Sequence, residues 1–256
     1  MADSAERPAA LVTGAATRLG LAFARSLAER GYDIALHYNR SADDADRAAS
    51  LIRSQGVACQ TFQRDLGGDD PGVLVDEVVA RFPALSALIN CASAYAPGTI
   101  AETTPALLKE QFAVNFFAPF LLTRGFAEHV TRGCVINIVD NKIAFQQNHY
   151  AAYLLSKKSL AELTRLAAVE FAPKLRVNAI APGVVLPGEQ RSDDYIAWRL
   201  EAIPAARQGR VEELIMALDY LLTNEFVTGQ VLFVDGGEGL NQRGRHAQDY
   251  AGGGGA

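Results

Sequence analysis

Residues 9–20 read Ala-Ala-Leu-Val-Thr-Gly-Ala-Ala-Thr-Arg-Leu-Gly, a short apolar run followed by a turn that contains glycine. Apolar residues then recur at helical spacing as far as Gly31. The stretch predicts a strand, a tight turn and a helix in immediate succession, as a dinucleotide fingerprint requires. Small residues in such a turn let the backbone approach a pyrophosphate at the N-terminus of the helix. An ordinary strand-to-helix loop fits the glycine equally well, but we expect Gly14, Arg18 and Leu19 to contact a cofactor.

The rest of the chain continues this alternation of strand and helix, about seven times in all. The expected strands are short, continuous apolar runs, which are typical of a parallel sheet buried on both faces. We therefore predict one Rossmann-like, doubly wound α/β domain over residues 8–240, with about seven parallel strands and helices on both faces. Residues 1–7 and 241–256 are predicted to be flexible tails. Residues 184–208, with their turn residues and charges, are the best candidate for a mobile cover over a ligand.

The composition fits one soluble globular domain, with 256 residues, 49% hydrophobic and 21% charged. The net charge of −5 argues against a nucleic acid or an anionic membrane as partner. Cys59, Cys91 and Cys134 lie far apart in apolar runs, so we interpret them as buried thiols and expect no disulfide and no metal site. No apolar run could span a bilayer, and the first residues lack an apolar signal segment, so the expected location is the cytoplasm.

The second strand, predicted over 33–38, ends in polar residues that bear on the choice of cofactor. NAD-binding domains usually carry an acid here, which accepts from the ribose 2′-hydroxyl. This chain has Arg40 and Ser41 instead, and a guanidinium with a hydroxyl at a helix start suits a 2′-phosphate, which favours NADPH. Ser41 and Asp44 also match a helix cap, and the two roles are compatible. The cofactor contacts expected from this segment are His37, Asn39, Arg40 and Ser41.

Polar and small residues follow the later strands in the same way. Ligands of a doubly wound sheet bind outside the carboxyl ends of its strands, so we expect these residues to meet at one edge. Asp65 could accept from an adenine amino group, although an ordinary loop acid fits it nearly as well. Asn115 interrupts the apolar face of a long helix predicted over 104–130, where a buried amide needs a partner. The residues expected at the edge are Asp65, Leu66, Asn90, Ala92, Ser93, Tyr95, Asp140, Pro182 and Gly183.

Tyr153 and Lys157 are four residues apart, which places them on one face of a helix. A free phenol has a pKa of ~10 and is a poor proton relay at neutral pH. A nearby ammonium stabilises the phenolate and lowers that pKa towards the working range. The same spacing also occurs by chance in surface helices, so the pair indicates a catalytic site only in combination with the other motifs of the chain.

Together these motifs make the chain similar to the short-chain dehydrogenase/reductase family over about residues 8–240. The resemblance implies that Tyr153 donates a proton, that Lys157 lowers its pKa and holds the ribose, and that Asn115 anchors a water relay. It also implies a homotetramer built on the long helices and the C-terminal segment. The motifs that carry the resemblance are Thr13-Gly14 with Gly20, Asp65, Asn90, Asn115, Tyr153-x-x-x-Lys157, Pro182-Gly183 and the final Asp235-Gly-Gly.

Three positions depart from the family pattern and indicate a particular group of enzymes within the family. Arg18 stands where most members have glycine, Ser93 replaces the glycine of Asn-Asn-Ala-Gly, and Asp140 replaces a serine thirteen residues before the tyrosine. In these positions the chain resembles the pteridine reductases and dihydromonapterin reductases. That resemblance implies that Arg18 and the Arg40-Ser41 pair bind NADPH, that Tyr95 stacks on a pterin, and that Asp140 works with Tyr153 and Lys157. The substrate contacts it implies are Arg18, Ser93, Tyr95, Asp140 and Tyr153.

The chemistry of a carboxylate agrees with this interpretation. An ionised Asp140 cannot donate a hydrogen bond to a carbonyl oxygen, so it is a poor tool for ketone reduction. Its charge also raises the pKa of Tyr153 and keeps the proton there for delivery to a ring nitrogen. The prediction is an NADPH-dependent enzyme that reduces a small molecule, a 7,8-dihydropterin, to the tetrahydropterin. Two alternatives stay open: a general carbonyl reductase of the same family, and a non-catalytic NADPH-binding regulatory protein.

Overall fold

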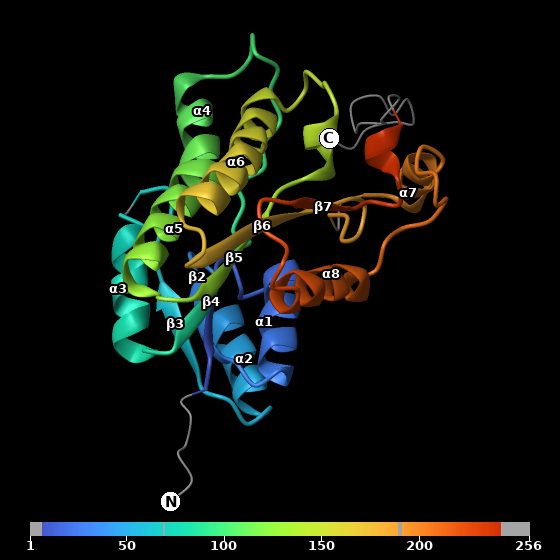
Figure 1. Ribbon diagram of the computed structural model, residues 1–256. Coiled ribbons are helices and arrows are strands. Elements are labelled where there is room, and N and C mark those ends of the chain that lie inside the picture. Colours follow the sequence, from blue (N-terminus) through green and yellow to red (C-terminus); the bar gives the residue numbers. More distant parts are fainter. Residues whose placement is uncertain (1–6, 69, 189–190, 242–256) are drawn as a thin grey trace, which may run out of the picture.

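The fold was analysed in a computed structural model that describes residues 7–68, 70–188 and 191–241. Apart from Arg7 and Asn241, the predicted flexible tails lie outside this range. The core is one sheet of seven strands in the order β3-β2-β1-β4-β5-β6-β7, and every pairing is parallel (Figure 1). The predicted doubly wound α/β architecture is therefore confirmed. The strands are β1 Ala9–Val12, β2 Asp33–Tyr38, β3 Cys59–Gln63, β4 Leu85–Asn90, β5 Gly133–Ile138, β6 Leu175–Pro182 and β7 Val231–Val234.

Helices cover both faces of the sheet. One face carries α1, α2 and α8, and the other carries α3, α5 and α6 (Figure 1). The strand order reverses between β1 and β4, which makes a crevice at their carboxyl ends. The α-helices are α1 Arg18–Glu29, α2 Ala42–Arg53, α3 Gly72–Arg81, α4 Pro105–Phe112, α5 Ala118–His129, α6 Ala151–Glu170, α7 Asp193–Leu200 and α8 Val211–Thr223.

The apolar runs of the strands follow from burial on both faces. In β1, Ala10 and Val12 pack into the core under α1 and α2, whereas Ala9 and Leu11 pack into the core under α3 and α5. All four residues are buried, so a polar side chain in this strand would lose its hydration on either face. The continuous apolar pattern of residues 9–12 is thus the signature of a central strand.

The long helix predicted over 104–130 is interrupted. Between α4 and α5, residues Ala113–Phe117 form a turn of π-helix. Pro119 lies at the start of α5 and has no backbone N–H to donate to the carbonyl of residue 115, so the regular helical ladder cannot continue. Such turns are often found at functional sites, and this one contains Asn115.

The segment 184–208 also differs from its expected appearance, because part of it is helical. Helix α7 is capped by Ser192, whose side chain accepts from the backbone N–H of Tyr195. Two residues of the segment, 189 and 190, lie outside the described structure. Among the described helices, none combines the length and the apolar character needed to cross a membrane.

Candidate active site

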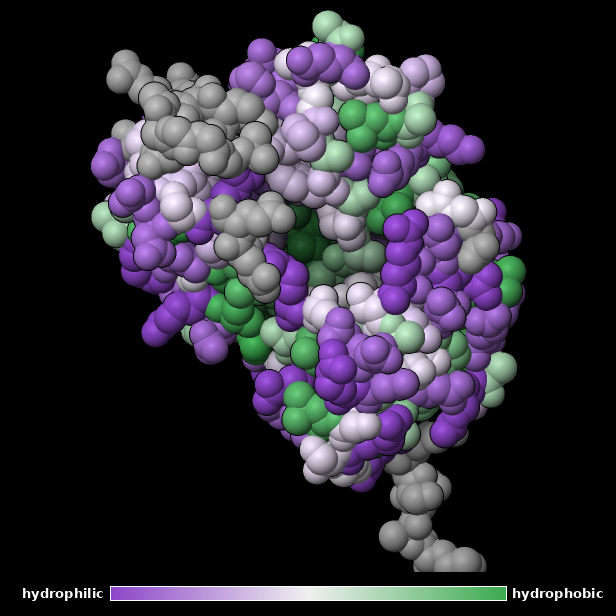
Figure 2. Space-filling model, turned by 180° about the vertical axis from the view of Figure 1, so that it is seen from behind, coloured by the Kyte–Doolittle hydropathy of each residue, from purple (hydrophilic) through white to green (hydrophobic). Residues whose placement is uncertain are grey.

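A cavity of about 1290 Å³ lies at the carboxyl ends of the strands. Figure 2 shows the molecule hollowed on the side that faces away in Figure 1, with apolar side chains inside the hollow. Of the residues predicted for the site, only Asn90 and Asn115 are absent from the cavity wall. Those that line it are Gly14, Arg18, Leu19, His37, Asn39, Arg40, Ser41, Asp65, Leu66, Ala92, Ser93, Tyr95, Asp140, Tyr153, Lys157, Pro182 and Gly183.

The turn between β1 and α1 contains small residues and is positioned by contacts with the residues that follow β4. Gly14 has φ +65°, and a Cβ at this position would lie 3.0 Å from Cα of Ala92. The hydroxyl of Thr13 accepts from the backbone N–H groups of Cys91 (2.9 Å) and Ala92 (3.0 Å). Helix α1 begins here with no acidic residue in its first turn, so its N-terminus can receive an anion such as a pyrophosphate.

His37 supports this turn and has no ring nitrogen left for a cofactor. Its Nδ1 accepts from the backbone N–H of Gly14 at 3.1 Å, and its Nε2 lies 3.0 Å from the carbonyl oxygen of Arg64. These partners require the neutral ring with the proton on Nε2. Burial lowers the pKa of His37 to about 4, which keeps the ring neutral. The expected direct contact with the cofactor is thereby replaced by a supporting role, because both polar atoms are already used.

The residues after β2 and β3 provide a place for a phosphate and an adenosine. Ser41 precedes α2, but its side chain makes no cap hydrogen bond, so the predicted Ser41–Asp44 cap is not formed. Asp44 instead accepts from Arg47. Arg40 is exposed at the rim of the cavity. Asp65 accepts from the backbone N–H of Gly67 at 3.0 Å and from the side chain of Asn39 at 3.3 Å.

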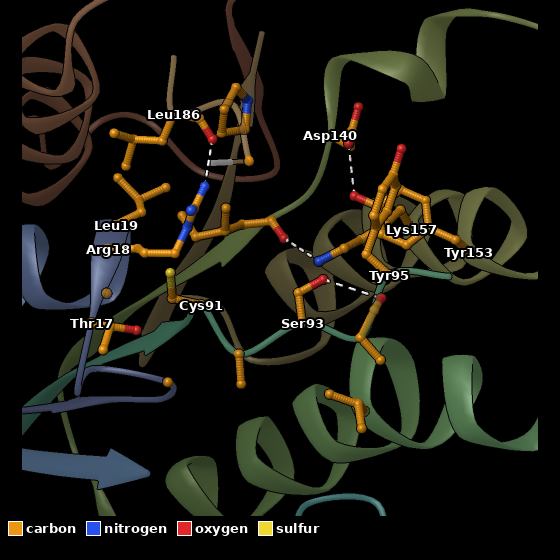
Figure 3. Close-up of a pocket in the computed structure, with 18 of the residues that line it drawn as sticks. Thr17, Arg18, Leu19, Cys91, Ser93, Tyr95, Asp140, Tyr153, Lys157 and Leu186 are labelled. Atoms are coloured by element: carbon orange, nitrogen blue, oxygen red, sulfur yellow. Dashed lines mark hydrogen bonds between the residues drawn. The ribbon is translucent and has the colours of Figure 1, made fainter. Parts of the chain in front are cut away.

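Asp140 and Tyr153 form the chemical centre of the cavity (Figure 3). The phenol of Tyr153 donates to one carboxylate oxygen of Asp140 at 2.7 Å. The other oxygen accepts from the backbone N–H of Lys142 at 2.8 Å, because Asp140 caps the short 3-10 helix Asn141–Ala144. Burial, with the charge and hydrogen bond of Asp140, raises the pKa of Tyr153 well above its usual range. The phenol therefore keeps its proton at neutral pH.

Lys157 lies beneath this pair and is fully enclosed. Its ammonium donates to the carbonyl oxygen of Ile138 at 2.8 Å. Burial lowers the pKa of Lys157 to about 8, although Asp140 and Cys91 oppose this shift. The expected lowering of the pKa of Tyr153 by Lys157 is not found, since burial and the nearer carboxylate outweigh the ammonium.

The two predicted site residues outside the cavity wall hold the elements together. The amide of Asn115 accepts from Ser93 Oγ (3.0 Å) and the Ala94 N–H (2.9 Å), and donates to the Ala94 carbonyl (2.8 Å) and Ser156 Oγ (3.1 Å). Its amide thus positions the loop after β4 against α6, and its expected role in a water relay stays a prediction. Asn90 likewise donates to Asn137 at 2.8 Å, a bond between β4 and β5, and its expected contact with a cofactor stays a prediction.

Two expected ligand contacts are made to the protein instead. Tyr95 is 49% exposed, but one face of its ring stacks on Tyr150, with centroids 4.5 Å apart and planes 12° apart. At most the opposite face is therefore available to a heterocycle. The guanidinium of Arg18 donates to the carbonyl oxygen of Leu186 at 2.5 Å (Figure 3). This bond joins the turn after β1 to the segment 184–208.

Several residues of the cavity wall carry no sequence signal of their own. Lys142 is buried on the short 3-10 helix, and Arg199 is buried on α7. The segment that contains α7 had no sequence pattern that could be assigned. The wall residues that the sequence did not single out include Lys142, Arg191, Tyr195, Ile196 and Arg199.

Comparisons with known proteins agree with this geometry. A family model described as enoyl-(acyl carrier protein) reductase matches residues 14–238. Pteridine reductase 1 of Leishmania tarentolae is 30% identical, over 94% of this chain and 100% of the relative. Dihydromonapterin reductase of an Enterobacter species is 31% identical, over 94% and 100%. The 3-oxoacyl-[acyl-carrier-protein] reductase FabG of Staphylococcus epidermidis is 30% identical, over 89% and 97%.

A solved structure is also similar over nearly the whole chain. FolM alternative dihydrofolate reductase 1 of Brucella canis, complexed with NADP, has a TM-score of 0.86 and 33% identity, covering 92% of this chain and 96% of that one. The doubly wound sheet, with the Tyr153–Lys157 helix at its carboxyl edge, defines a Rossmann-type oxidoreductase. The chain belongs to the short-chain dehydrogenase/reductase family.

Proposed function

We propose that the protein is an NADPH-dependent reductase that converts a 7,8-dihydropterin to the tetrahydropterin. The observation that carries this proposal is the 2.7 Å hydrogen bond from Tyr153 to Asp140 inside the cavity. A carboxylate occupies the position from which a ketone reductase would donate a hydrogen bond. Two relatives named as a pteridine reductase and a dihydromonapterin reductase, and a structural neighbour named as an alternative dihydrofolate reductase, support the same substrate class.

The residues present fit NADPH. The small-residue turn at Gly14 and the N-terminus of α1 would hold the pyrophosphate. Arg40 and the hydroxyl of Ser41, which makes no cap hydrogen bond to α2, would hold the 2′-phosphate. When bound, the dihydronicotinamide supplies the hydride for the substrate carbon. Lys157, whose side chain lines the cavity, would hold the ribose.

The protein's own part in the reaction is to deliver a proton. In a 7,8-dihydropterin the double bond joins N5 and C6, and reduction forms a C6–H bond and an N5–H bond as that π bond breaks. Tyr153 is the proton donor to N5, because its raised pKa keeps the proton on the phenol until N5 becomes basic. The phenolate that remains lies beside the carboxylate of Asp140, which favours prompt reprotonation. The ammonium of Lys157 offsets part of the negative charge.

The second candidate is a carbonyl reductase acting on 3-oxoacyl substrates, which the similarity to FabG favours. In that reaction the carbonyl oxygen needs two hydrogen-bond donors. Tyr153 is one, but the carboxylate of Asp140 can only accept. Replacing Asp140 by serine separates the two candidates, since it removes the carboxylate and adds a hydroxyl donor.

The test measures NADPH oxidation with dihydromonapterin, dihydrobiopterin and a 3-oxoacyl thioester. We expect turnover of the dihydropterins only, and a loss of roughly 100- to 10,000-fold in Tyr153→Phe, the usual contribution of a general acid. Asp140→Ser should lose pterin turnover to a similar degree. Thioester turnover by the parent enzyme that persists in Asp140→Ser, without pterin turnover, would establish the carbonyl reductase instead.

A further inference from the structure

We propose that Lys142 and Arg199 form a subsite for an anionic group, a carboxylate or a phosphate, on the C6 substituent of the pterin. This inference rests on the proposed function and specifies its substrate class. The two residues come from different elements, the 3-10 helix after β5 and helix α7, and both line the cavity.

Lys142 is a buried cation without an acceptor. It is 8% exposed, and its ammonium makes no hydrogen bond or ion pair with any residue that the structure describes. Its nearest recorded partners are two aromatic rings, with Nζ 5.9 Å from the centroid of Tyr95 and 5.4 Å from that of Tyr150. Ring faces attract a cation, but they replace only part of the lost hydration. The ammonium is therefore prepared to receive an acceptor from the cavity.

The neighbouring carboxylates are already engaged by other donors. Glu238 accepts from Arg199 at 2.7 Å and from the side chain of Asn141 at 2.8 Å. One oxygen of Asp140 accepts from Tyr153, and the other from the backbone N–H of Lys142 itself. Each of these carboxylate oxygens thus has a donor other than the Lys142 ammonium. A ligand group in the cavity can supply an acceptor that the Lys142 ammonium does not share with these donors.

Arg199 adds a second cation with an unused donor. It is 6% exposed, and its guanidinium reaches Glu238 and the hydroxyl of Tyr195, but its buried Nε–H has no partner. Burial lowers the pKa of Lys142, and the charge of Arg199 lowers it further, whereas Asp140, Tyr150 and Glu238 raise it. Asn141, the neighbour of Lys142, and Arg199 both donate to the carboxylate of Glu238, so the two cations lie near each other and repel. An anion between them relieves this repulsion and supplies the missing acceptor.

The position of the pair relative to Tyr153 identifies the part of the substrate concerned. Since Tyr153 protonates N5 in the proposed reaction, the substituent on the adjacent C6 begins next to this residue. Tyr95 bridges the distance, because its ring centroid is 4.7 Å from that of Tyr153 and 5.9 Å from Nζ of Lys142. A substituent that follows Tyr95 from C6 reaches the ammonium. A neutral polyhydroxylated chain offers it only weak acceptors, whereas a carboxylate or phosphate forms a charge-assisted bond.

The first test measures the affinity of the NADP⁺-loaded enzyme for pterin-6-carboxylate and for 6-hydroxymethylpterin, by fluorescence titration. These two ligands share the pterin ring and carry a one-carbon C6 substituent, which is an anionic carboxylate in one and a neutral hydroxymethyl group in the other. We expect the carboxylate to bind roughly 10- to 100-fold more tightly, the range of a hydrogen bond to a charged group. Lys142→Met should remove this preference by weakening the carboxylate alone, and Lys142→Arg should restore most of it. Lys158→Met, which removes a lysine that bonds Gln146 outside the cavity, should leave both affinities unchanged.

Turnover distinguishes the two sources of the anion. Dihydrofolate carries carboxylates, a phosphate ester of dihydromonapterin carries a phosphate, and dihydromonapterin itself is neutral. The anion that the site selects should show the lowest KM, and Lys142→Met should raise that KM about tenfold or more with kcat little changed.

The outcomes are separable. Equal affinity of the parent enzyme for the two C6 ligands would overturn the inference, and no variant is needed for this test. The proposed function would still stand if the same enzyme reduced a dihydropterin. An equal loss for both ligands in Lys142→Met would also overturn it, since that indicates a structural role. If the parent enzyme neither bound nor reduced any pterin, the proposed function would fall and this inference with it.

Discussion

Tyr153 and Asp140 form a pair in which two negative groups compete for one proton. Burial disfavours the phenolate, and the carboxylate 2.7 Å away disfavours it further, so the pKa of Tyr153 rises. Lys157 is held on the far side by the carbonyl of Ile138 and does not reverse this order. Such a phenol gives up its proton only to a strong base. In the proposed reaction N5 becomes that base once hydride has been added to C6.

His37 allows a prediction about stability and pH. Its pKa is lowered to about 4 in the folded protein, against about 6.5 in an unfolded chain, so the unfolded state takes up a proton first as the pH falls. The stability due to the neutral ring is complete above pH ~6.5 and is lost towards pH ~4, by about 3 kcal/mol in all. Urea unfolding of the cofactor-free protein at a series of pH values measures this loss.

The matched control is His37→Gln, whose amide can accept from Gly14 and donate to Arg64 but does not titrate. Carboxylates contribute to acid unfolding in both proteins, so the difference between the two curves isolates His37. Parallel curves between pH 7 and pH 5 would show that the histidine is not the titrating group.

At the scale of elements, we predict that the connection from β2 to α2 determines the choice between NADPH and NADH. Arg40 is exposed at the cavity rim, and α2 begins directly after Ser41. In Arg40→Ala we expect NADPH binding to weaken by roughly 1–3 kcal/mol, the range of a charge-assisted hydrogen bond, with little change for NADH. Fluorescence titration with each cofactor measures the difference.

Arg47→Ala is a suitable control, because Arg47 lies on α2, the helix that follows Arg40, and already bonds Asp44. It removes an equal charge without touching the cavity wall. A parent protein with equal affinity for the two cofactors would contradict the role of Arg40.

The π-helical turn between α4 and α5 shows how one element serves the site without entering it. Because Pro119 interrupts the ladder, the helix widens at Asn115, and the amide gains four partners on two other segments. This arrangement clamps the loop after β4, which carries Ser93 and Tyr95, against α6, which carries Tyr153. The relative position of loop and phenol therefore depends on Asn115.

At the scale of the whole molecule, one surface has the character of an interface between subunits. Helices α4, α5 and α6 lie on one side of the sheet (Figure 1), and large apolar side chains remain exposed on them and on the π-helical turn. Exposed apolar side chains gathered on packed helices are a common feature of association sites. The exposed residues are Leu108, Phe117, Phe120, Leu155, Leu166 and Val169.

We predict that the protein is a homo-oligomer assembled through this surface. The double variant Phe117→Glu/Phe120→Glu should shift the mass measured by light scattering to a smaller species, because two charges cannot be buried in an apolar contact. Leu51→Glu, a change at a similarly exposed apolar residue of α2 on the other face, should leave the mass unchanged. A monomeric parent protein would refute the prediction.

The sequence alone determined the architecture and the edge at which the site lies. Apolar periodicity and turn chemistry act between near neighbours, so residues 9–20 were enough to predict β1, its turn and α1. The rule that ligands bind at the carboxyl ends of parallel strands then brought together residues as distant as Gly14 and Gly183, and both line the cavity.

Only the tertiary structure decided what each side chain does there. His37 supports the turn because Arg64, 27 residues away, takes its second nitrogen. Arg199 turns towards the cavity region because Glu238, 39 residues further on, holds its guanidinium. Burial, partner and pKa depend on contacts between distant segments, and no local pattern encodes them. For that reason the sequence predicted that the charge of Asp140 raises the pKa of Tyr153, but only the fold showed that burial is the larger cause of that rise.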